Sequence, residues 1–324
     1  MTTILDSVKP EKESSDEIEV YKKNILASSS PTGLDLIKNA YANAIEYRGI
    51  GHGNRGLGTL LGLLFLCIAV TLSTLFIMTE LGPRKFSSVR FVVTALFVCI
   101  AIPLAAYFLL RCVRFEFFRP LDEPIIFDRE HRKVYRIYRD VKLGWKGLFA
   151  KWPMKAATYD WDLIQAERHA LTDRNMTITG RTHWLVFEVR KACKDPRIVD
   201  TFTVGSGIRD GKATVSAVFE QIRRFMEARG PHLPSGERLA RVEPPATLLQ
   251  CLARTGPYGA TLRRWWQHSR LSTIAGFLIF PLALPFVTLL GVLSWLTYVT
   301  APQFDWSDEV VAVVGAPLAD NGPV

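Results

Sequence analysis

Three long apolar segments constrain this chain more than any other feature. They cover Leu57–Met78, Phe91–Leu110 and Ile274–Val299, and none of them contains a charged residue. A helix of about 20 apolar residues crosses the ~30 Å hydrocarbon core of a bilayer, and each segment is at least that long. Buried helices of water-soluble proteins seldom stay free of charge over such a length. The sequence therefore predicts an integral membrane protein.

The positive charge of the chain lies largely beside these segments. The formal net charge is +9, and the flanking basic residues are Arg48, Arg55, Arg111, Arg114, Arg119, Arg263, Arg264 and Arg270. Anionic lipid headgroups and the positive-inside rule account for this placement, so we expect no nucleic-acid partner. The five cysteines form no C-x-x-C pair and the histidines no H-x-x-x-H pair. The sequence therefore predicts no disulfide framework, metal site or cofactor.

The region before the first apolar segment is polar at its start. Residues 1–32 contain no apolar stretch of a signal peptide, and they predict a disordered cytosolic tail. Leu34, Ile37, Tyr41 and Ile45 then recur at helical spacing. This spacing predicts an amphipathic helix at the membrane over 33–47, within a segment 33–56 that ends in a glycine-rich hinge.

The first two apolar segments predict an antiparallel transmembrane hairpin over 57–110, because only a short loop joins them. Basic residues are more frequent outside the hairpin than in its connecting loop. The outer set is Lys38, Arg48, Arg55, Arg111, Arg114 and Arg119, and the loop set is Arg84, Lys85 and Arg90. By the positive-inside rule, the N-terminus and the region after the hairpin lie in the cytosol.

The region 114–230 predicts a cytosolic β-rich domain. Short β-branched and aromatic runs alternate with turn sequences at Phe115–Phe118, Ile125–Phe127, Val134–Tyr138, Thr158–Ile164, Asn175–Ile178, Trp184–Val189 and Val199–Val204. One amphipathic helix follows between Gly211 and Gly230. About seven strands and one C-terminal helix resemble the half-open barrel of pleckstrin-homology-like domains. The fold class expected is α+β, with three transmembrane helices flanking this domain.

A proline-rich linker over 231–272 leads to the third apolar segment. It ends in Arg263, Arg264, Trp265, Trp266 and Arg270, a pattern typical of an interfacial membrane anchor. Pro281 and Pro285 interrupt the segment 274–299. We expect one kinked span, which carries the acidic tail 300–324 to the outside. A re-entrant segment that returns the tail to the cytosol is the alternative.

The residues with most resemblance to a catalytic group are Asp160 and Asp162, with Glu167 and His169 nearby. Paired carboxylates can share acid and base roles. On a strand, however, Asp160 and Asp162 lie on one face while Tyr159 and Trp161 lie on the other, which needs no catalysis to explain it. No charged residue lies inside a span, so the usual mark of an ion pathway is missing. A pore formed by several copies of the three spans is left open as an alternative.

The layout resembles a family of uncharacterised proteobacterial membrane proteins that are often encoded beside type VI secretion tip and effector genes. The matching motifs are Phe127–Tyr135, Tyr159–Asp162, Phe280-Pro281 and Pro302–Val310. The resemblance implies a protein of the bacterial inner membrane that acts in immunity against an effector or as an effector accessory. It implies no catalytic residues.

The first hypothesis is a non-enzymatic membrane protein whose β-rich domain binds a protein partner, for instance a secreted toxin. The surfaces expected to bind are the strand at Tyr135 and Tyr138 and the helix face at Arg223, Arg224 and Glu227. The second hypothesis is a lipid-active enzyme with Asp160, Asp162 and His169 as acid, base or metal groups. A third is a lipid sensor with a basic loop, formed by Arg129, Arg132, Lys133, Arg136 and Arg139.

Overall fold

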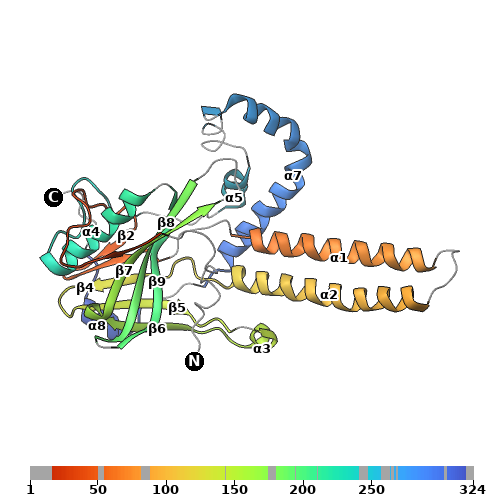
Figure 1. The fold of residues 1–324 in the computed structure, drawn as a ribbon. Coiled ribbons are helices and arrows are strands. Elements are labelled where there is room, and N and C mark those ends of the chain that lie inside the picture. Colours follow the sequence, from red (N-terminus) through yellow and green to blue (C-terminus); the bar gives the residue numbers. More distant parts are fainter. Residues whose placement is uncertain are drawn as a thin grey trace.

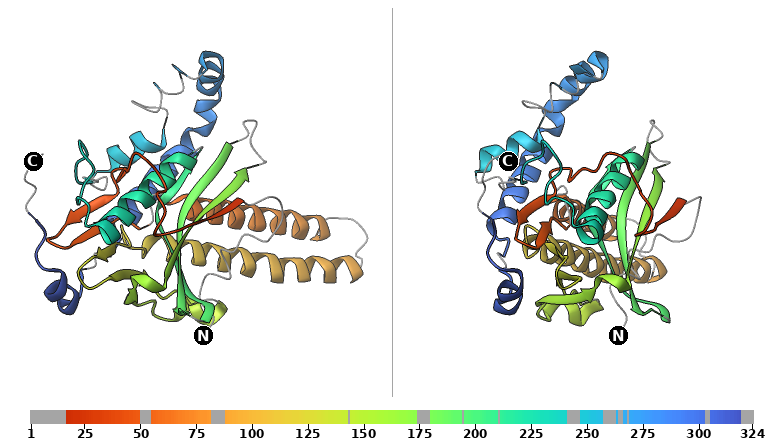
Figure 2. Two further views of the ribbon diagram at one scale, coloured as in Figure 1. Left: turned by 60° about the vertical axis from the view of Figure 1, so that its left-hand side comes forward. Right: turned by 90° about the vertical axis from the view of Figure 1, so that its left-hand side faces the viewer.

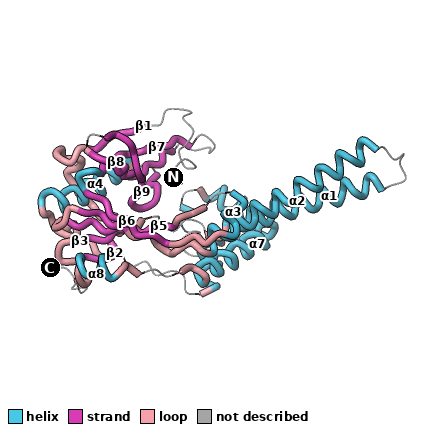
Figure 3. Tube along the Cα trace, turned by 90° about the horizontal axis from the view of Figure 1, so that it is seen from below, coloured by secondary structure: helices cyan, strands magenta, loops and turns pink. Residues whose placement is uncertain are grey.

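The protein has a mixed α+β fold in which a long helical hairpin projects from a β-rich domain (Figure 1). The structure is a computed structural model. It describes residues 17–49, 55–81, 88–142, 144–173, 180–193, 195–209, 211–240, 247–256, 263, 266–267, 269–302 and 305–318. Within these residues the strands form two antiparallel sheets. Strands and hairpin occupy opposite ends of the molecule (Figure 3).

The five-stranded sheet is a meander in the order β2-β3-β4-β5-β6. Its strands are β2 (Ile37–Ala40), β3 (Ala44–Tyr47), β4 (Ile125–Asp128), β5 (Lys133–Arg139) and β6 (Met154–Asp160). β3 and β4 are direct neighbours, with Ala44 opposite Asp128 and Tyr47 opposite Ile125. The chain between them forms the helical hairpin. The hairpin is therefore an insertion between two adjacent strands of one sheet.

The four-stranded sheet has the order β1-β7-β8-β9. Its strands are β1 (Glu17–Tyr21), β7 (Ile164–Asp173), β8 (Gly180–Ala192) and β9 (Asp195–Arg209). A 3-10 turn at Trp161–Leu163 carries the chain from one sheet to the other. Because side chains alternate across a strand, each sheet has one face toward the core.

The core lies between the inner faces of the two sheets and helix α4 (Lys212–Ala228). Its largest fully buried side chains include Phe127, Trp161, Phe187, Phe219 and Phe225. Phe127 contacts Trp161 edge to face, and Phe187 stacks on Phe202 across β8 and β9. Burial of each such side chain contributes on the order of 1.5–3 kcal/mol. The predicted helix between Gly211 and Gly230 is confirmed.

Helices α1 (Leu57–Leu81) and α2 (Ser88–Phe117) form the hairpin. Among the described residues, three helical segments are long and apolar enough to cross a membrane: Leu57–Thr79, Phe91–Phe117 and Phe280–Val299. The first two pack closely where a Cβ on Gly62 would lie 2.9 Å from Leu109 Cα. Glu116 of α2 accepts hydrogen bonds at 2.8 Å from the backbone amides of Gly58 and Thr59. This carboxylate satisfies amides at the positive end of α1.

The third apolar helix, α7 (Arg270–Val299), contacts the hairpin near its base. A Cβ on Gly56 would meet Ser294 N at 2.8 Å, and the Thr300 hydroxyl donates to Phe117 O at 2.9 Å. Helix α5 (Leu248–Thr255) packs on α7 near Gly291. Beyond these contacts α7 turns away from α1 and α2 in both views of Figure 2. Among the described residues, the last turns of α7 therefore pack on the base of the hairpin.

The C-terminal helix α8 (Asp308–Val314) packs on the outer face of the five-stranded sheet. Val310 and Val314 contact a cluster formed by Tyr41, Ala44, Ile126 and Tyr135. The backbone amide of Leu318 donates to Ala40 O at 2.7 Å. Residues 305–318 therefore lie on the same side of the hairpin as the β-rich domain. This packing favours the re-entrant alternative for the third segment, because the apolar residues of the tail complete the sheet's outer face. The side of the membrane on which the tail lies stays a prediction.

Three local predictions were wrong. The expected amphipathic helix over 33–47 is the β2–β3 hairpin, whose apolar residues alternate between the inner and outer faces. Residues 17–32 of the expected disordered tail are described and include β1, which pairs with β7, while residues 1–16 lie outside the described residues. The expected strand at Phe115–Phe118 is mostly the end of α2. The expected strand Asn175–Ile178 lies outside the described residues.

Candidate functional site

Asp160 and Asp162 do not form a catalytic pair. Asp160 ends β6 opposite Lys133, and its side chain is exposed. Asp162 lies in the 3-10 turn, is 62% exposed, and pairs with Arg132 at 2.5 Å between Nη2 and Oδ1. This guanidinium holds the pKa of Asp162 below its usual range, chiefly through the hydrogen bond. A carboxylate that an arginine keeps ionised in this way is suited to an ion pair rather than to proton transfer.

The same arginine joins Asp162 to the helix α4. Arg132 Nη2 lies 3.3 Å from Glu227 Oε1, and that oxygen also accepts a 2.7 Å hydrogen bond from Trp161 Nε1. The ammonium of Lys23 lies 4.3 Å from the centroid of Trp161. Burial lowers the pKa of Lys23 to about 8, against the opposing effect of the nearby carboxylates of Asp162 and Glu227. The group therefore fixes the buried Trp161 at the junction of the sheets.

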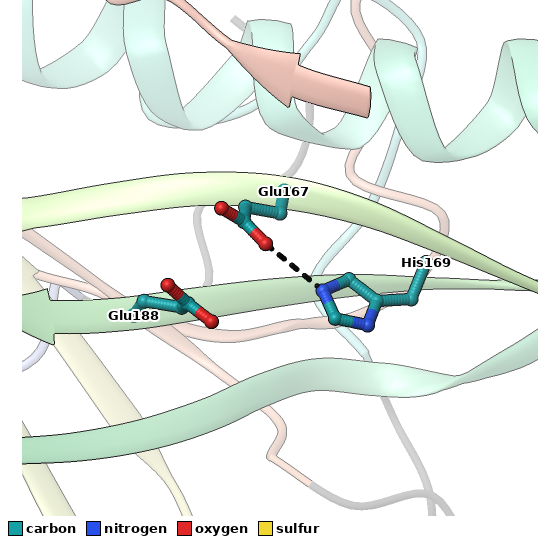
Figure 4. A group of neighbouring side chains, drawn as sticks. All are labelled: Glu167, His169 and Glu188. Carbon is teal, nitrogen blue, oxygen red and sulfur yellow. Dashed lines mark hydrogen bonds and ion pairs between the residues drawn. The ribbon is translucent and has the colours of Figure 1, made fainter. Parts of the chain in front are cut away.

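His169 belongs to a different group, on the outer face of the four-stranded sheet. Glu167 and His169 are two residues apart on β7 and point the same way, and Glu188 lies on the adjacent strand β8 (Figure 4). His169 Nε2 lies 3.0 Å from Glu167 Oε2. One ligand atom from each of the three side chains lies within 4.8 Å of the others. The enzyme hypothesis thus joined residues that the structure separates.

One imidazole nitrogen and two carboxylate oxygens can hold a divalent cation such as Zn²⁺, with water as a further ligand. Glu167 is buried at 7% exposure. The side chains also satisfy one another without an ion. Gln165 donates to Glu167 Oε1 at 2.8 Å and accepts a hydrogen bond from Arg190. A cation here would have to compete with a proton of the imidazole and with this network.

The residues expected to bind a partner are mostly engaged within the domain. Tyr135 is 5% exposed beneath α8, and Tyr138 lies on the opposite face of β5 because their positions in the strand differ by three, an odd number. Arg223 and Arg224 both pair with the buried carboxylate of Glu220, at 2.7 and 2.8 Å. Glu227 holds Trp161, as described above. Tyr135 is not available to a partner while α8 stays in place.

The expected membrane anchor is described in part. Arg263, Trp266 and Arg270 are exposed, with Trp266 at 46%. Arg264 and Trp265 lie outside the described residues.

A second basic and aromatic cluster, which the sequence patterns had not indicated, lies at the domain-side end of α2. Arg111 and Arg114 of α2 and Arg139 of β5 surround the ring of Trp152, with guanidinium carbons 5.3, 4.8 and 4.6 Å from its centroid. We call these four residues the arginine–tryptophan cluster. The short helix α3 (Gly144–Phe149) lies beside it.

Two of these clusters depend on contacts that the sequence could not have shown fully. The Glu-x-His pattern at 167–169 was visible, but Glu188 joins it only through the register in which Gln165 opposes Glu188. Trp152 and Arg139 meet the α2 arginines only because β5 ends beside the end of α2. The available signal was the i, i+3 spacing of Arg111 and Arg114, which places both on one helix face.

Comparison with known proteins gives one match. A family model described as a family of unknown function, DUF6708, matches residues 102–314, more than half of the chain. The match begins within α2 and extends through β4–β9 and α4 to the end of α8. No curated protein and no solved structure matches the chain. The protein therefore belongs to the family of unknown function DUF6708.

Proposed function

We propose that this protein is a non-enzymatic membrane protein whose β-rich domain is held at the cytosolic face of a bacterial inner membrane and binds a protein partner there. The supporting observation is an exposed apolar strand at the edge of the four-stranded sheet. On β1, Ile18 and Val20 point outward and are 55% and 49% exposed. β1 is terminal in the sheet order, so its outer backbone edge faces no other described strand.

An open strand edge with apolar side chains suits a partner that adds a strand or packs on the sheet face. Leu171 of β7, 36% exposed, extends this surface beside His169, which is opposite Ile18. We take the domain itself to be pleckstrin-homology-like. The support is the order in the chain of the five-stranded meander, the antiparallel strands β7, β8 and β9, and the closing helix α4.

The resemblance of the sequence motifs to proteins encoded beside type VI secretion genes suggests which partner to test. On that basis the partner is a secreted effector, and the role is immunity or effector handling. The test is to express the product of each neighbouring gene, as a candidate effector, in cells that carry or lack this protein. We expect growth to stop without the protein and to be rescued with it.

Two isoleucines of similar exposure, one inside the proposed interface and one outside it, provide a structural control for the rescue test. Ile18→Asp and Val20→Asp should abolish rescue and co-purification of the effector. Ile25→Asp alters an isoleucine of similar exposure, 53%, that lies outside the sheet, and it should leave both intact. Equal rescue by Ile18→Asp and Ile25→Asp would remove β1 from the interface. No rescue by the unaltered protein would overturn the immunity role.

A second candidate function, metal-dependent chemistry on lipids, is favoured by the group of Glu167, His169 and Glu188. It predicts that the full-length protein binds Zn²⁺ in calorimetry and that phospholipid turnover requires the ion. His169→Ala and Glu188→Gln should then lose both properties. Asp160→Asn, an exposed carboxylate outside the group, serves as the control. Absence of ion binding by the unaltered protein would exclude this function.

A further inference from the structure

We propose that the arginine–tryptophan cluster of Arg111, Arg114, Arg139 and Trp152 binds the phosphate headgroup of an anionic phospholipid from the surrounding bilayer. The inference rests on the membrane placement of the protein within the proposed function. It does not depend on the protein partner or on the β1 surface.

The first argument is the convergence of three guanidinium groups on one ring. Trp152 is 7% exposed, and its indole Nε1 donates to Gly147 O at 3.0 Å, which fixes the ring against α3. A fixed ring holds Arg111, Arg114 and Arg139 by cation–π contacts and so limits their rotamers. Guanidinium groups held in place lose less entropy when they bind a phosphate.

The second argument is that these arginines are hydrogen-bonded to backbone carbonyls rather than to carboxylates. Arg111 donates to Lys142 O at 3.0 Å, Arg114 to Ala150 O, and Arg139 to Arg114 O at 3.5 Å. No ion pair joins any of the three to a carboxylate among the residues that the structure describes. Each guanidinium has five N–H donors, so donors remain for an anion.

The nearby acidic side chains are engaged elsewhere. Glu116 caps α1, Glu123 pairs with Arg119 at 3.8 Å, and Asp140 pairs with Lys155 at 2.7 Å. Burial, together with the positive charge of Arg114, lowers the pKa of Arg139 to about 10, and Glu123 offsets this effect only in part. The positive charges of Arg114 and Arg139 thus repel each other without a full counter-charge, and a bound anion would reduce this repulsion.

The third argument is the depth of the cluster relative to the membrane. Tyr107, Arg111 and Arg114 are spaced i, i+4, i+7 along α2, so they share one helix face. Tyr107 contacts Trp145 of α3, with ring centroids 4.4 Å apart. Trp145 and Phe149 are 62% and 86% exposed. Exposed aromatic side chains beside the end of an apolar helix are typical of the headgroup level of a bilayer.

The surroundings add positive charge and apolar surface together. Lys142, Lys146 and Lys151 are exposed around α3. A phospholipid offers a phosphate to the arginines and acyl chains to Trp145, Phe149 and the apolar face of α2. A free phosphate or a soluble phosphorylated molecule would leave these two aromatic side chains in water. The combination therefore favours a lipid over a soluble anion.

The test measures lipid binding by the purified full-length protein in dodecyl maltoside micelles. Native mass spectrometry with added phosphatidylglycerol or phosphatidylcholine gives the dissociation constant for each lipid. We expect phosphatidylglycerol to bind preferentially, and Arg139→Gln and Arg114→Gln to weaken its binding at least about tenfold each. Arg197→Gln, which removes a charge at an exposed position outside the cluster, should leave binding unchanged.

Three outcomes would overturn the inference. They are equal binding of the two lipids, equal weakening by Arg197→Gln, and displacement of phosphatidylglycerol by soluble glycerol phosphate at equal concentration. Melting temperatures measured without lipid separate lost binding from lost folding, and Arg139→Lys, which retains the charge, provides a milder variant. Because no protein partner is present, failure of the immunity test leaves this result unaffected, and the reverse also holds.

Discussion

Ile45 pairs directly with Phe127 in adjacent antiparallel strands, although the whole hairpin of α1 and α2 lies between them in the chain. Both side chains are fully buried in the core. The β-rich domain is therefore built from residues on both sides of the hairpin, and neither side can complete the sheet alone.

The first prediction concerns this shared core. Phe127→Ala should destabilise the domain by about 3–5 kcal/mol, because it removes a fully buried ring that contacts Tyr47 and Trp161. Limited proteolysis in detergent at increasing temperature would show cleavage within β4–β9 at a lower temperature. Phe97→Ala, on the partly exposed surface of α2, should leave the pattern unchanged. Equal protease resistance of Phe127→Ala and the unaltered protein would contradict the pairing.

The second prediction concerns the side of the membrane on which α8 lies. Cys193 is exposed at the end of β8, and Ala316 is exposed just after α8. Two variants should be compared, one with Cys193 as its only cysteine and one with only Ala316→Cys. Because α8 packs on the domain, an impermeant maleimide should label both in vesicles of the same orientation. Labelling in opposite orientations would mean that α7 crosses the membrane and α8 leaves the sheet.

The third prediction separates a structural role from a catalytic one at the junction of the sheets. Glu227→Ala should cost about 1–3 kcal/mol, because the buried indole N–H of Trp161 loses its acceptor. Asp162→Ala removes only an exposed ion pair and should cost about 1 kcal/mol or less. Glu227→Gln keeps an acceptor and should fall between them. Chemical unfolding in detergent measures all three, and a larger loss in Asp162→Ala would contradict the assignment.

The fourth prediction concerns acid stability and the buried Glu220. Burial alone would raise the pKa of Glu220, but hydrogen bonds from Arg223, the Ala27 amide and Arg224 outweigh it and lower the pKa to about 2, from an ordinary 4.5. The ionised group therefore stabilises the fold fully above about pH 4.5, and this contribution is lost as the pH falls toward 2.

Melting temperatures across this pH range test the assignment. The decline between pH 4.5 and 2 should be smaller in Glu220→Gln, which should also be less stable at neutral pH because the charge-assisted bonds are lost. Glu130→Gln removes an exposed carboxylate and should follow the unaltered protein. An unchanged acid decline in Glu220→Gln would show that other carboxylates govern it.

The membrane hairpin and most of the later strands were predictable from local patterns. Charge-free runs predicted α1 and α2, and β-branched alternation at Val134–Tyr138 and Trp184–Val189 predicted β5 and β8. The spacing of Leu34, Ile37, Tyr41 and Ile45 misled, because four apolar residues can follow a helical spacing and still alternate as two short strands. Only the pairing of β3 with β4, across the hairpin, decides between these structures.

The position of the C-terminal segment could not be predicted from local sequence patterns either, because it depends on contacts between residues that are distant in the chain. The expected single span, together with the acidic charge of the tail, predicted a tail on the outer side of the membrane, but Val310 and Val314 are covered by Tyr135 and Ile126. Those partners lie far away in the chain. The same holds for the metal-type group, where Glu188 meets His169 only through strand register. Long-range contacts of this kind are set by the whole fold rather than by a short window.

The insertion of the hairpin between β3 and β4 also determines when the strands can pair during biosynthesis. A ribosome produces β1 to β3 first, then α1 and α2, and only afterwards the strands with which β1 and β3 pair. The first strands must therefore wait without their partners while the hairpin is made. Sheet closure is therefore a late event in the life of the chain, since β1 and β3 meet their partners only after both helices of the hairpin have been synthesised.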